Sequence, residues 1–219
     1  MQTITIDIET GALPCEQREA FRPTMETVKF GATKDAAKKE AKLADEIEKW
    51  ERGDGAALSA ATGEILLVCY AIDDGPVEAL HREHYGEGDI ISIIAHHCAG
   101  KTIVGHNVVG FDLPFINRRA MILGAPSIKW DNAYRAGMDD DPYVNDTMRM
   151  WQMGDRQEMI KLERLAAAFG YPMPEEPSPV TGAKFAEFWH GGEQEACIAY
   201  CEQDVEMTRH VYNRMMGAI

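Results

Sequence analysis

The sequence predicts an α/β fold with a mixed sheet, and two observations near the N-terminus support that prediction. Residues 3–9 alternate strictly between polar residues and isoleucine, and residues 64–72 form a nearly continuous apolar run. Alternation is typical of a strand with one covered face, whereas a continuous apolar run indicates a central strand covered on both faces. Beyond residue 77, short strand-like and longer helix-like segments follow one another, which is the order expected of an α/β protein.

The remaining elements are expected in the following order. Short strands are predicted at 77–81, 101–105 and 143–147, and helices at 89–98, 113–123, 161–169 and 193–216. The helix over 161–169 should end at Gly170, because glycine readily adopts the left-handed conformation that follows a helix. A proline-rich loop over 172–179 precedes the last helix, which is the longest. The length of the chain, 219 residues, is that of one domain over 1–219.

Residues 14–62 differ in character from the rest and are predicted to be a helical insertion between the first two strands. Over 33–52, charges of both signs alternate while alanines and larger apolar residues recur at helical spacing. This pattern predicts a charged amphipathic helix. Two interpretations remain open for it. The helix is either a solvated surface element or an arm that meets a phosphate backbone through Lys34, Lys38, Lys39 and Lys42.

The composition narrows the class of protein. The chain is 45% hydrophobic, carries a formal net charge of −14 and has no apolar run long enough to cross a bilayer. These features argue against a disordered protein, a membrane-spanning protein and a binder that holds nucleic acid through a broad basic face. They do not argue against an enzyme that meets phosphates through bound cations. The start of the chain shows no secretory signal, and the five cysteines include no C-x-x-C pair, so we expect a cytoplasmic location.

Acidic residues recur in three motifs along the chain. Asp7 and Glu9 lie two apart on the first strand and therefore project from the same face. Asp112 follows a glycine-flanked loop, at the start of a helix, where it could also be an N-cap. Tyr200 and Asp204 lie four apart and share one face of the last helix. Each motif alone is common, and only their combination points to a particular chemistry.

In this order, the three motifs resemble those of the DEDD superfamily of 3′–5′ exonucleases, which have a ribonuclease H-like fold. The loop GHNVVGFDLPFINRR (105–119) and the helical YCEQDV (200–205) look like the family's second and third motifs. A tyrosine four residues before the last aspartate is similar to the DEDDy branch. The DEDDh branch has histidine one residue earlier, where this chain has Ala199. The resemblance covers about 1–13 and 62–216, and it is strongest to predicted exonucleases related to the proofreading domain of family B DNA polymerases.

The resemblance implies a metal-dependent 3′–5′ exonuclease that releases nucleoside 5′-monophosphates from single-stranded or frayed ends, with DNA favoured over RNA. It implies two divalent cations, Mg²⁺ or Mn²⁺, which prefer oxygen ligands and so suit a set of carboxylates. The implied metal ligands are Asp7, Glu9, Asp112 and Asp204, and with Tyr200 these are the catalytic residues. The expected substrate contacts are Thr10, Leu13, Asn107 and Phe111.

Two other functions remain open. One is an exoribonuclease of the same type, because nothing in the sequence separates the two sugars. The other is a catalytically silent nucleic-acid-binding module, although a cluster of carboxylates that repel one another argues against it. A proofreading enzyme of this kind would work in trans, beside a replication or repair partner that the sequence does not identify.

The remaining polar and aromatic candidates are interpreted as structural. Asp146 is expected to buttress the site or to cap a helix. The cysteines Cys197 and Cys201 are interpreted as small core residues, and the tryptophans Trp130, Trp151 and Trp189 as aromatic core residues. The histidines His96, His97 and His106 are polar groups without metal-ligand spacing, and Asp139–Asp141 is a solvated turn.

Overall fold

The computed structural model describes residues 2–129 and 143–217. The predictions for Trp130 and for the acidic turn at 139–141 fall outside these residues. The chain divides into two compact units, one made of Met1–Glu9 and Ile65–Ile219 and the other of Thr10–Glu64. The second unit contains the predicted insertion (14–62) and a few residues on either side of it. That the whole chain is one domain stays a prediction.

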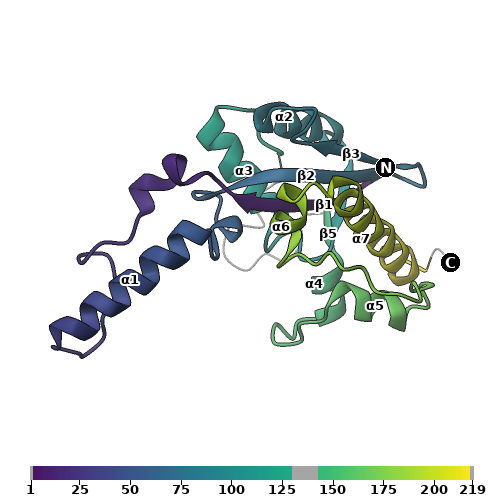
Figure 1. Cartoon of the computed structure of the whole chain (residues 1–219). Coiled ribbons are helices and arrows are strands. Elements are labelled where there is room, and N and C mark those ends of the chain that lie inside the picture. The colour runs from purple at the N-terminus through teal and green to yellow at the C-terminus, as the bar shows by residue number, and fades with distance from the viewer. Residues whose placement is uncertain (1, 130–142, 218–219) are drawn as a thin grey trace. The chain divides into compact units, whose positions relative to one another are not determined.

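A five-stranded mixed sheet is the centre of the first unit, with strand order β3-β2-β1-β4-β5 (Figure 1). β2 and β3 pair antiparallel, whereas β1 with β4 and β4 with β5 pair in parallel. All five strands were predicted, and the α/β architecture with a mixed sheet is confirmed. The strands are β1 (Thr3–Ala12), β2 (Gly63–Ile72), β3 (Val77–His81), β4 (Thr102–Gly105) and β5 (Val144–Asp146).

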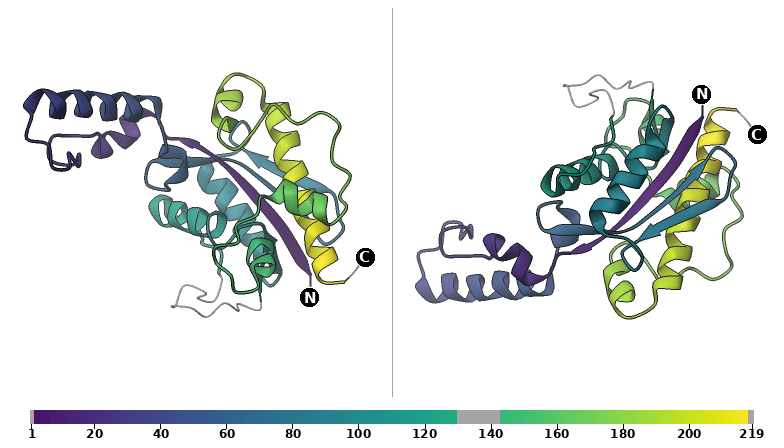
Figure 2. Two further views of the ribbon diagram at one scale, coloured as in Figure 1. Left: turned by 90° about the horizontal axis from the view of Figure 1, so that it is seen from below. Right: turned by 90° about the horizontal axis from the view of Figure 1, so that it is seen from above.

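Helices cover both faces of this sheet (Figures 1 and 2). α2 (Glu87–Cys98) and α3 (Asp112–Leu123) lie on one face. α7 (Gln194–Met215) crosses the other face, and α5 (Leu162–Ala168) and α6 (Phe185–His190) pack against it. The four long helices of this unit match the predicted ones to within two residues at each end.

The side chains of β2 show why its sequence is apolar throughout. Tyr70 stacks on His97 of α2, with ring centroids 4.9 Å apart. Leu67 and Cys69 point the other way, into a buried cluster that includes Phe185 of α6 and Cys197 of α7. Alternate residues of one strand therefore reach the helices on both faces, as expected for a central strand.

A buried ion pair links the helices on the α2 side to the sheet. Glu87 and Arg119 lie 2.6 Å apart between Oε2 and Nη2, and their side chains are only 7% and 4% exposed. The second oxygen of Glu87 also accepts a hydrogen bond from the backbone N–H of Ile65 at 2.9 Å. One carboxylate therefore joins α2, α3 and β2.

Two short helices of the first unit, α4 and α6, were not predicted. α4 (Thr147–Gln152) begins where the side chain of Asp146 accepts hydrogen bonds from the backbone N–H groups of Met148 and Arg149. A helix of six residues shows too little periodicity to be recognised in the sequence. The predicted end of α5 is confirmed, because Gly170 has the expected positive φ of 81°.

The second unit contains the predicted charged helix, α1 (Ala36–Arg52), and two 3₁₀ helices, η1 (Cys15–Phe21) and η2 (Ala56–Leu58). α1 begins at Asp35, whose carboxylate accepts from the N–H of Lys38, and no side chain of this helix is fully buried. The guanidinium of Arg18, 3% exposed, donates to the carbonyl oxygens of Trp50 and Glu51 and lies over the Trp50 ring. Arg18 thus fixes η1 to the C-terminal end of α1.

None of the helices in the described part of the chain combines the length and the apolarity that crossing a bilayer requires.

Candidate active site

Three carboxylates from opposite ends of the chain meet in the first unit. Asp7 and Glu9 on β1 and Asp204 on α7 each offer one oxygen, and these oxygens all lie within 4.8 Å of one another. The strand period explains the first two, because Ile6 and Ile8 are buried on the opposite face of β1. Glu9 and Asp204 are each only 9% exposed. The first and third acidic motifs therefore converge as the sequence predicted.

Asp112 joins the site from the start of α3, beside the part of β1 that continues past its pairing with β4. It is the first residue of α3, is 4% exposed, and its Oδ1 accepts a hydrogen bond from the backbone N–H of Ile8 at 3.1 Å. Ile8 lies beyond the last β1–β4 pair, Thr5 with Val104, so Asp112 takes the place of a strand partner. The alternative that Asp112 is an N-cap is wrong, since Phe111 holds that position and makes no side-chain cap bond.

Burial raises the pKa of all four carboxyl groups. The pKa of Asp112 and that of Asp204 each rise to about 8. The pKa values of Asp7 and Glu9 lie well above their usual range, mainly through desolvation and then through neighbouring carboxylates. The negative charge of Asp112 acts on Asp7, and that of Asp7 acts on Glu9 and Asp204. With a pKa of about 8, Asp112 and Asp204 are largely protonated at neutral pH unless a cation compensates their charge.

Tyr200 lies one helical turn before Asp204 and is partly buried. Burial, followed by the charges of Asp204 and Glu9, raises the pKa of its hydroxyl far above the usual value. The hydroxyl therefore keeps its proton at neutral pH and can donate hydrogen bonds. It acts on Asp204 as a donor that lowers the pKa of that carboxyl, in opposition to burial.

Two further side chains near the carboxylates were not predicted to be there. The Sγ of Cys201 donates to Oδ2 of Asp7 at 3.4 Å, and burial raises the pKa of this thiol, so it stays neutral. Cys201 was interpreted as a small core residue, and its full burial agrees with that. Glu163, exposed on α5, raises the pKa of Asp204 and of Tyr200 by its charge. Cys201 shares a helix face with Asp204, so its position near the carboxylates could have been predicted from the sequence. No sequence signal indicates that Glu163 lies near them.

Asp146 organises the loop between β4 and α3. Its carboxylate accepts from the backbone N–H groups of Asn107 at 2.9 Å and Val109 at 3.1 Å, and it also caps α4. Asn107 has a positive φ of 59°, and its side chain fills the space beside Gly110. A Cβ at Gly110 would lie 2.2 Å from Oδ1 of Asn107, so a larger residue there would displace the Asn107 side chain. The predicted helix cap is therefore confirmed, and that Asp146 buttresses the site through this loop stays a prediction.

The four expected substrate contacts lie in different surroundings. Asn107 is in the loop just described, and Phe111 lies beside Phe115, with ring centroids 5.5 Å apart. Thr10 and Leu13 belong to the second unit and are buried within it. The hydroxyl of Thr10 donates to the carbonyl of Ala57, and the N–H of Leu13 to that of Thr62. Nucleotide binding by these four residues stays a prediction.

The donor chemistry of the cluster fits a divalent cation. Among residues 2–129 and 143–217, Asp7, Glu9 and Asp204 are the one group of three or more side chains placed to hold a metal ion. All three donors are carboxylate oxygens, the ligands that Mg²⁺ and Mn²⁺ prefer. Histidine is absent from this group, and His106, which was interpreted as structural, instead bonds Thr147 and the carbonyl of Ile160.

Comparison with protein families matches residues 65–218 to a family described as predicted 3′–5′ exonucleases related to the exonuclease domain of PolB. The matched residues include Asp112, Tyr200 and Asp204 but begin after Asp7 and Glu9. Comparison with curated proteins gave no match.

A solved structure of the family B DNA polymerase from the hyperthermophilic archaeon Pyrobaculum calidifontis has a similar fold. The match has a TM-score of 0.62 at 17% sequence identity and covers 99% of this chain. It covers 24% of the polymerase, so this chain spans about a quarter of that protein's length. The likeness confirms the ribonuclease H-like fold predicted from the sequence.

Proposed function

The chain belongs to the family of predicted 3′–5′ exonucleases related to the exonuclease domain of PolB, and we propose that it shortens nucleic acids from the 3′ end. The proposed substrate is a single-stranded or frayed end, with DNA favoured over RNA. The observation that carries this proposal is the meeting of Asp7, Glu9 and Asp204 within 4.8 Å. Two of these carboxylates lie outside the residues that the family match covers, so the geometry supports the assignment independently.

The family implies a divalent metal, and we propose two ions, Mg²⁺ or Mn²⁺, as the cofactor. Asp7, Glu9 and Asp204 would hold them. Asp112 would support the second ion, directly or through water, from its position at the edge of β1. Bound in this way, the ions would lower the pKa of a water molecule and stabilise charge on the phosphate.

The DEDDy assignment gives Tyr200 a positioning role. Because its pKa is raised, the phenol holds its proton and orients the attacking water as a hydrogen-bond partner; it is not the general base. In the reaction, the water oxygen bonds to phosphorus while the bond from phosphorus to the 3′ oxygen of the preceding nucleotide breaks. That oxygen takes up a proton, and a nucleoside 5′-monophosphate leaves.

Two alternatives have specific consequences. An exoribonuclease would use the same carboxylates and differ only in its preferred sugar. A silent nucleic-acid-binding module would have no use for four buried carboxyl groups, which destabilise the fold when they ionise. We also propose that a replication or repair partner brings the substrate to the enzyme in trans. A cytoplasmic location is proposed as well, and the five free cysteines support it.

The experiment is a cleavage assay with purified protein and matched single- and double-stranded DNA and RNA, each labelled at its 5′ end. With Mn²⁺ or Mg²⁺, we expect a ladder that shortens from the 3′ end, faster on single-stranded DNA than on RNA, and no ladder in EDTA. Binding to these substrates without cleavage would instead identify a silent module. If Asp7→Ala cleaves these substrates as fast as the unchanged protein does, the assignment is wrong.

A further inference from the structure

Positive charge gathers around the start of α1, from the segment before it to its first half, in a chain that is otherwise strongly acidic. Residues 29–42 contain five lysines and only two carboxylates, whereas the whole chain carries a formal net charge of −14. Four of these lysines are exposed. Such a local reversal of charge is what a polyanion would bind. The lysines are Lys29, Lys34, Lys38, Lys39 and Lys42.

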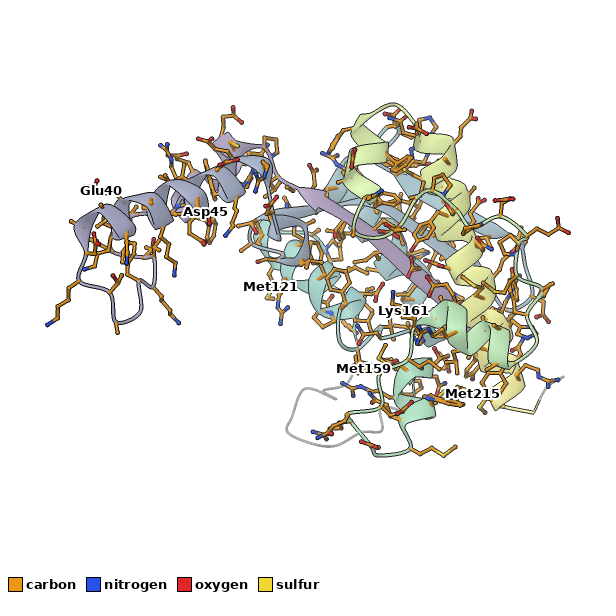
Figure 3. All side chains as sticks on the ribbon, turned by 60° about the horizontal axis from the view of Figure 1, so that its bottom comes forward. Glu40, Asp45, Met121, Met159, Lys161 and Met215 are labelled. Carbon is orange, nitrogen blue, oxygen red and sulfur yellow. The ribbon has the colours of Figure 1, made fainter. Side chains whose placement is uncertain are left out.

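The basic side chains at the two ends of α1 differ in whether they form ion pairs. In the C-terminal half, Lys49 pairs with Asp45 at 2.7 Å, and Arg52 pairs with Glu48 at 2.9 Å. In the N-terminal half and the segment just before it, none of the five lysines forms an ion pair with any residue that the structure describes. The charges of these lysines are therefore available to a ligand. Side chains, including those of Glu40 and Asp45, project from α1 along its length (Figure 3).

Helix stability does not explain the placement of these lysines. Lys38 and Lys39 lie in the first turn of α1, which contains no acidic residue. Acidic side chains are favoured in that turn and basic ones disfavoured, because the N-terminal end of a helix carries partial positive charge. The carboxylate of Asp35 is engaged in capping, where it accepts from the N–H of Lys38 at 3.3 Å.

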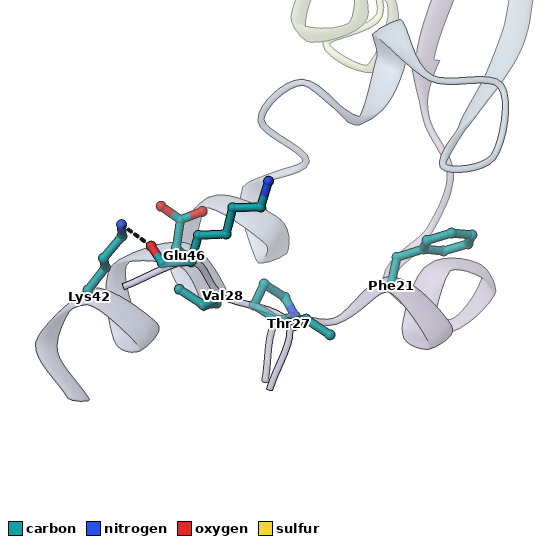
Figure 4. Close-up of a pocket in the computed structure, with 7 residues that line it drawn as sticks. Phe21, Thr27, Val28, Lys42 and Glu46 are labelled. Carbon is teal, nitrogen blue, oxygen red and sulfur yellow. Dashed lines mark hydrogen bonds between the residues drawn. The ribbon is translucent and has the colours of Figure 1, made fainter. Parts of the chain in front are cut away.

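Two of the lysines line a pocket formed within the second unit (Figure 4). Nζ of Lys42 donates to the carbonyl oxygen of Lys29 at 2.6 Å, which holds these two residues together. Phe21, 52% exposed, contributes an aromatic ring to the same pocket. Exposed aromatic rings beside lysines are the usual means of holding single strands, because bases stack on the ring and phosphates meet the cations. The lining is completed by Pro23, Thr27, Val28 and Glu46.

We propose that this pocket, lined by Lys29 and Lys42, and the other three lysines of residues 29–42 bind the phosphate backbone of single-stranded nucleic acid. The pocket and the five lysines are together called here the lysine groove. The choice of nucleic acid as the polyanion rests on the proposed exonuclease function. The lysine groove would give the enzyme a hold on its substrate beyond the carboxylate cluster.

The test is the affinity for a fluorescent single-stranded oligothymidylate, measured by anisotropy in EDTA so that no cleavage occurs. Lys34→Ala/Lys38→Ala should bind on the order of tenfold more weakly at low salt, because two phosphate contacts are lost. Its plot of log affinity against log salt should be shallower by about 0.7 for each lost contact. The matched control, Lys49→Ala/Arg52→Ala, removes the same charge from the same helix but outside the groove, and should bind as the unchanged protein does.

Phe21 is tested in the same assay. Phe21→Ala should weaken binding about fivefold or more and leave the salt dependence unchanged, since it removes stacking and no charge. Met25→Ala is its control, because Met25 is 49% exposed in the same segment but does not line the pocket. Circular dichroism checks that each variant keeps its helices.

A second assay separates this inference from the proposed function. The p-nitrophenyl ester of thymidine 5′-monophosphate carries a single phosphate, so Lys34→Ala/Lys38→Ala should hydrolyse it at the rate of the unchanged protein. If the unchanged protein cleaves nothing but binds oligonucleotides through these lysines, the exonuclease proposal fails and the lysine groove stands. Unchanged affinity and salt dependence in Lys34→Ala/Lys38→Ala would overturn the lysine groove alone. So would lysine-dependent binding to anionic lipid vesicles by a protein that does not bind oligothymidylate.

Discussion

The carboxylate of Asp112 accepts a hydrogen bond from the backbone N–H of Ile8, 3.1 Å away, although 104 positions separate them in the sequence. Ile8 lies between Asp7 and Glu9, so this bond fixes the second acidic motif beside the first. The proximity is also electrostatic, because the charge of Asp112 raises the pKa of Asp7. β1 is thus approached by Asp112 at its edge and by Asp204 over its face.

Substitutions of the proposed metal ligands should lower the cleavage rate much more than substitution of Tyr200. Asp7→Ala and Asp204→Ala should each lower the rate of single-strand cleavage by about 10³-fold or more, because metal-assisted catalysis supplies several kcal/mol. Tyr200→Phe should lower it by only about 10- to 100-fold, since a positioning hydroxyl is lost and no ligand. Initial rates on 3′-labelled DNA measure both effects, and Asp155→Ala, at an exposed turn, is the control. A Tyr200→Phe rate as low as that of Asp7→Ala would contradict the role given to Tyr200.

Divalent metal should stabilise the fold. Binding to the native cluster at a concentration about 100 times the dissociation constant contributes about 2.7 kcal/mol, which corresponds to a rise in Tm of roughly 5–10 °C at this size. A thermal-shift titration with Mn²⁺ measures it. Asp7→Ala should lose most of the rise in Tm. In buffer that contains Na⁺ and no divalent cation, neither protein should show a rise in Tm. An equal rise in Asp7→Ala would place the bound metal elsewhere.

The metal-free protein should become less stable as pH rises. The pKa values of Asp112 and Asp204 are about 8 in the folded state but about 4 when unfolded, so between these values the folded protein binds more protons. Stability contributed by these protonated groups is complete below about pH 4 and is lost as pH rises through about 8. Urea unfolding in EDTA across this range measures the loss, which we expect to reach a few kcal/mol.

Asp204→Asn provides the comparison for this pH dependence, because an amide does not ionise. Its stability should exceed that of the unchanged protein at pH 8 to 9 in EDTA and should vary less with pH. Saturating Mn²⁺ should reverse the trend in the unchanged protein, since metal binds the deprotonated carboxylates. Identical slopes for both proteins in EDTA would show that Asp204 is ionised without metal.

The buried pair of Glu87 and Arg119 should be important for stability and not for chemistry. Glu87→Ala removes the carboxylate that binds Arg119 and the N–H of Ile65, and it should cost about 3–5 kcal/mol of unfolding free energy in urea. Glu83→Ala, at an exposed position nearby, should change it by about 0.5 kcal/mol or less. A small effect of Glu87→Ala would mean that the fold relaxes around the lost pair.

Much of the fold could be predicted because its signals are local. The alternation over 3–9 and the apolar run over 64–72 identified β1 and β2, and the long helices followed from their periodicity. The same periods placed Asp7 with Glu9 on one strand face and Tyr200 with Asp204 on one helix face. Their convergence, however, depended on the order of all three motifs and on their resemblance to known exonucleases.

What could not be predicted depends on tertiary contacts that leave no local pattern. The bonds from Asp146 to the loop at Asn107 link segments 39 positions apart. The pairing of Glu87 with Arg119 and the approach of Glu163 to Asp204 likewise follow from how separate helices pack. The difference in ion pairing along α1 also appears only in the structure, and the choice between the two interpretations of this helix stays a prediction.

The most direct test of the carboxylate cluster is anomalous diffraction at the manganese absorption edge, measured on crystals that were grown or soaked with Mn²⁺. We expect anomalous density for two ions, bound by oxygens of Asp7, Glu9 and Asp204, with Asp112 on the side of the second ion. Density elsewhere in the molecule, with these oxygens turned away from any common ion, would show that the cluster is not a metal centre.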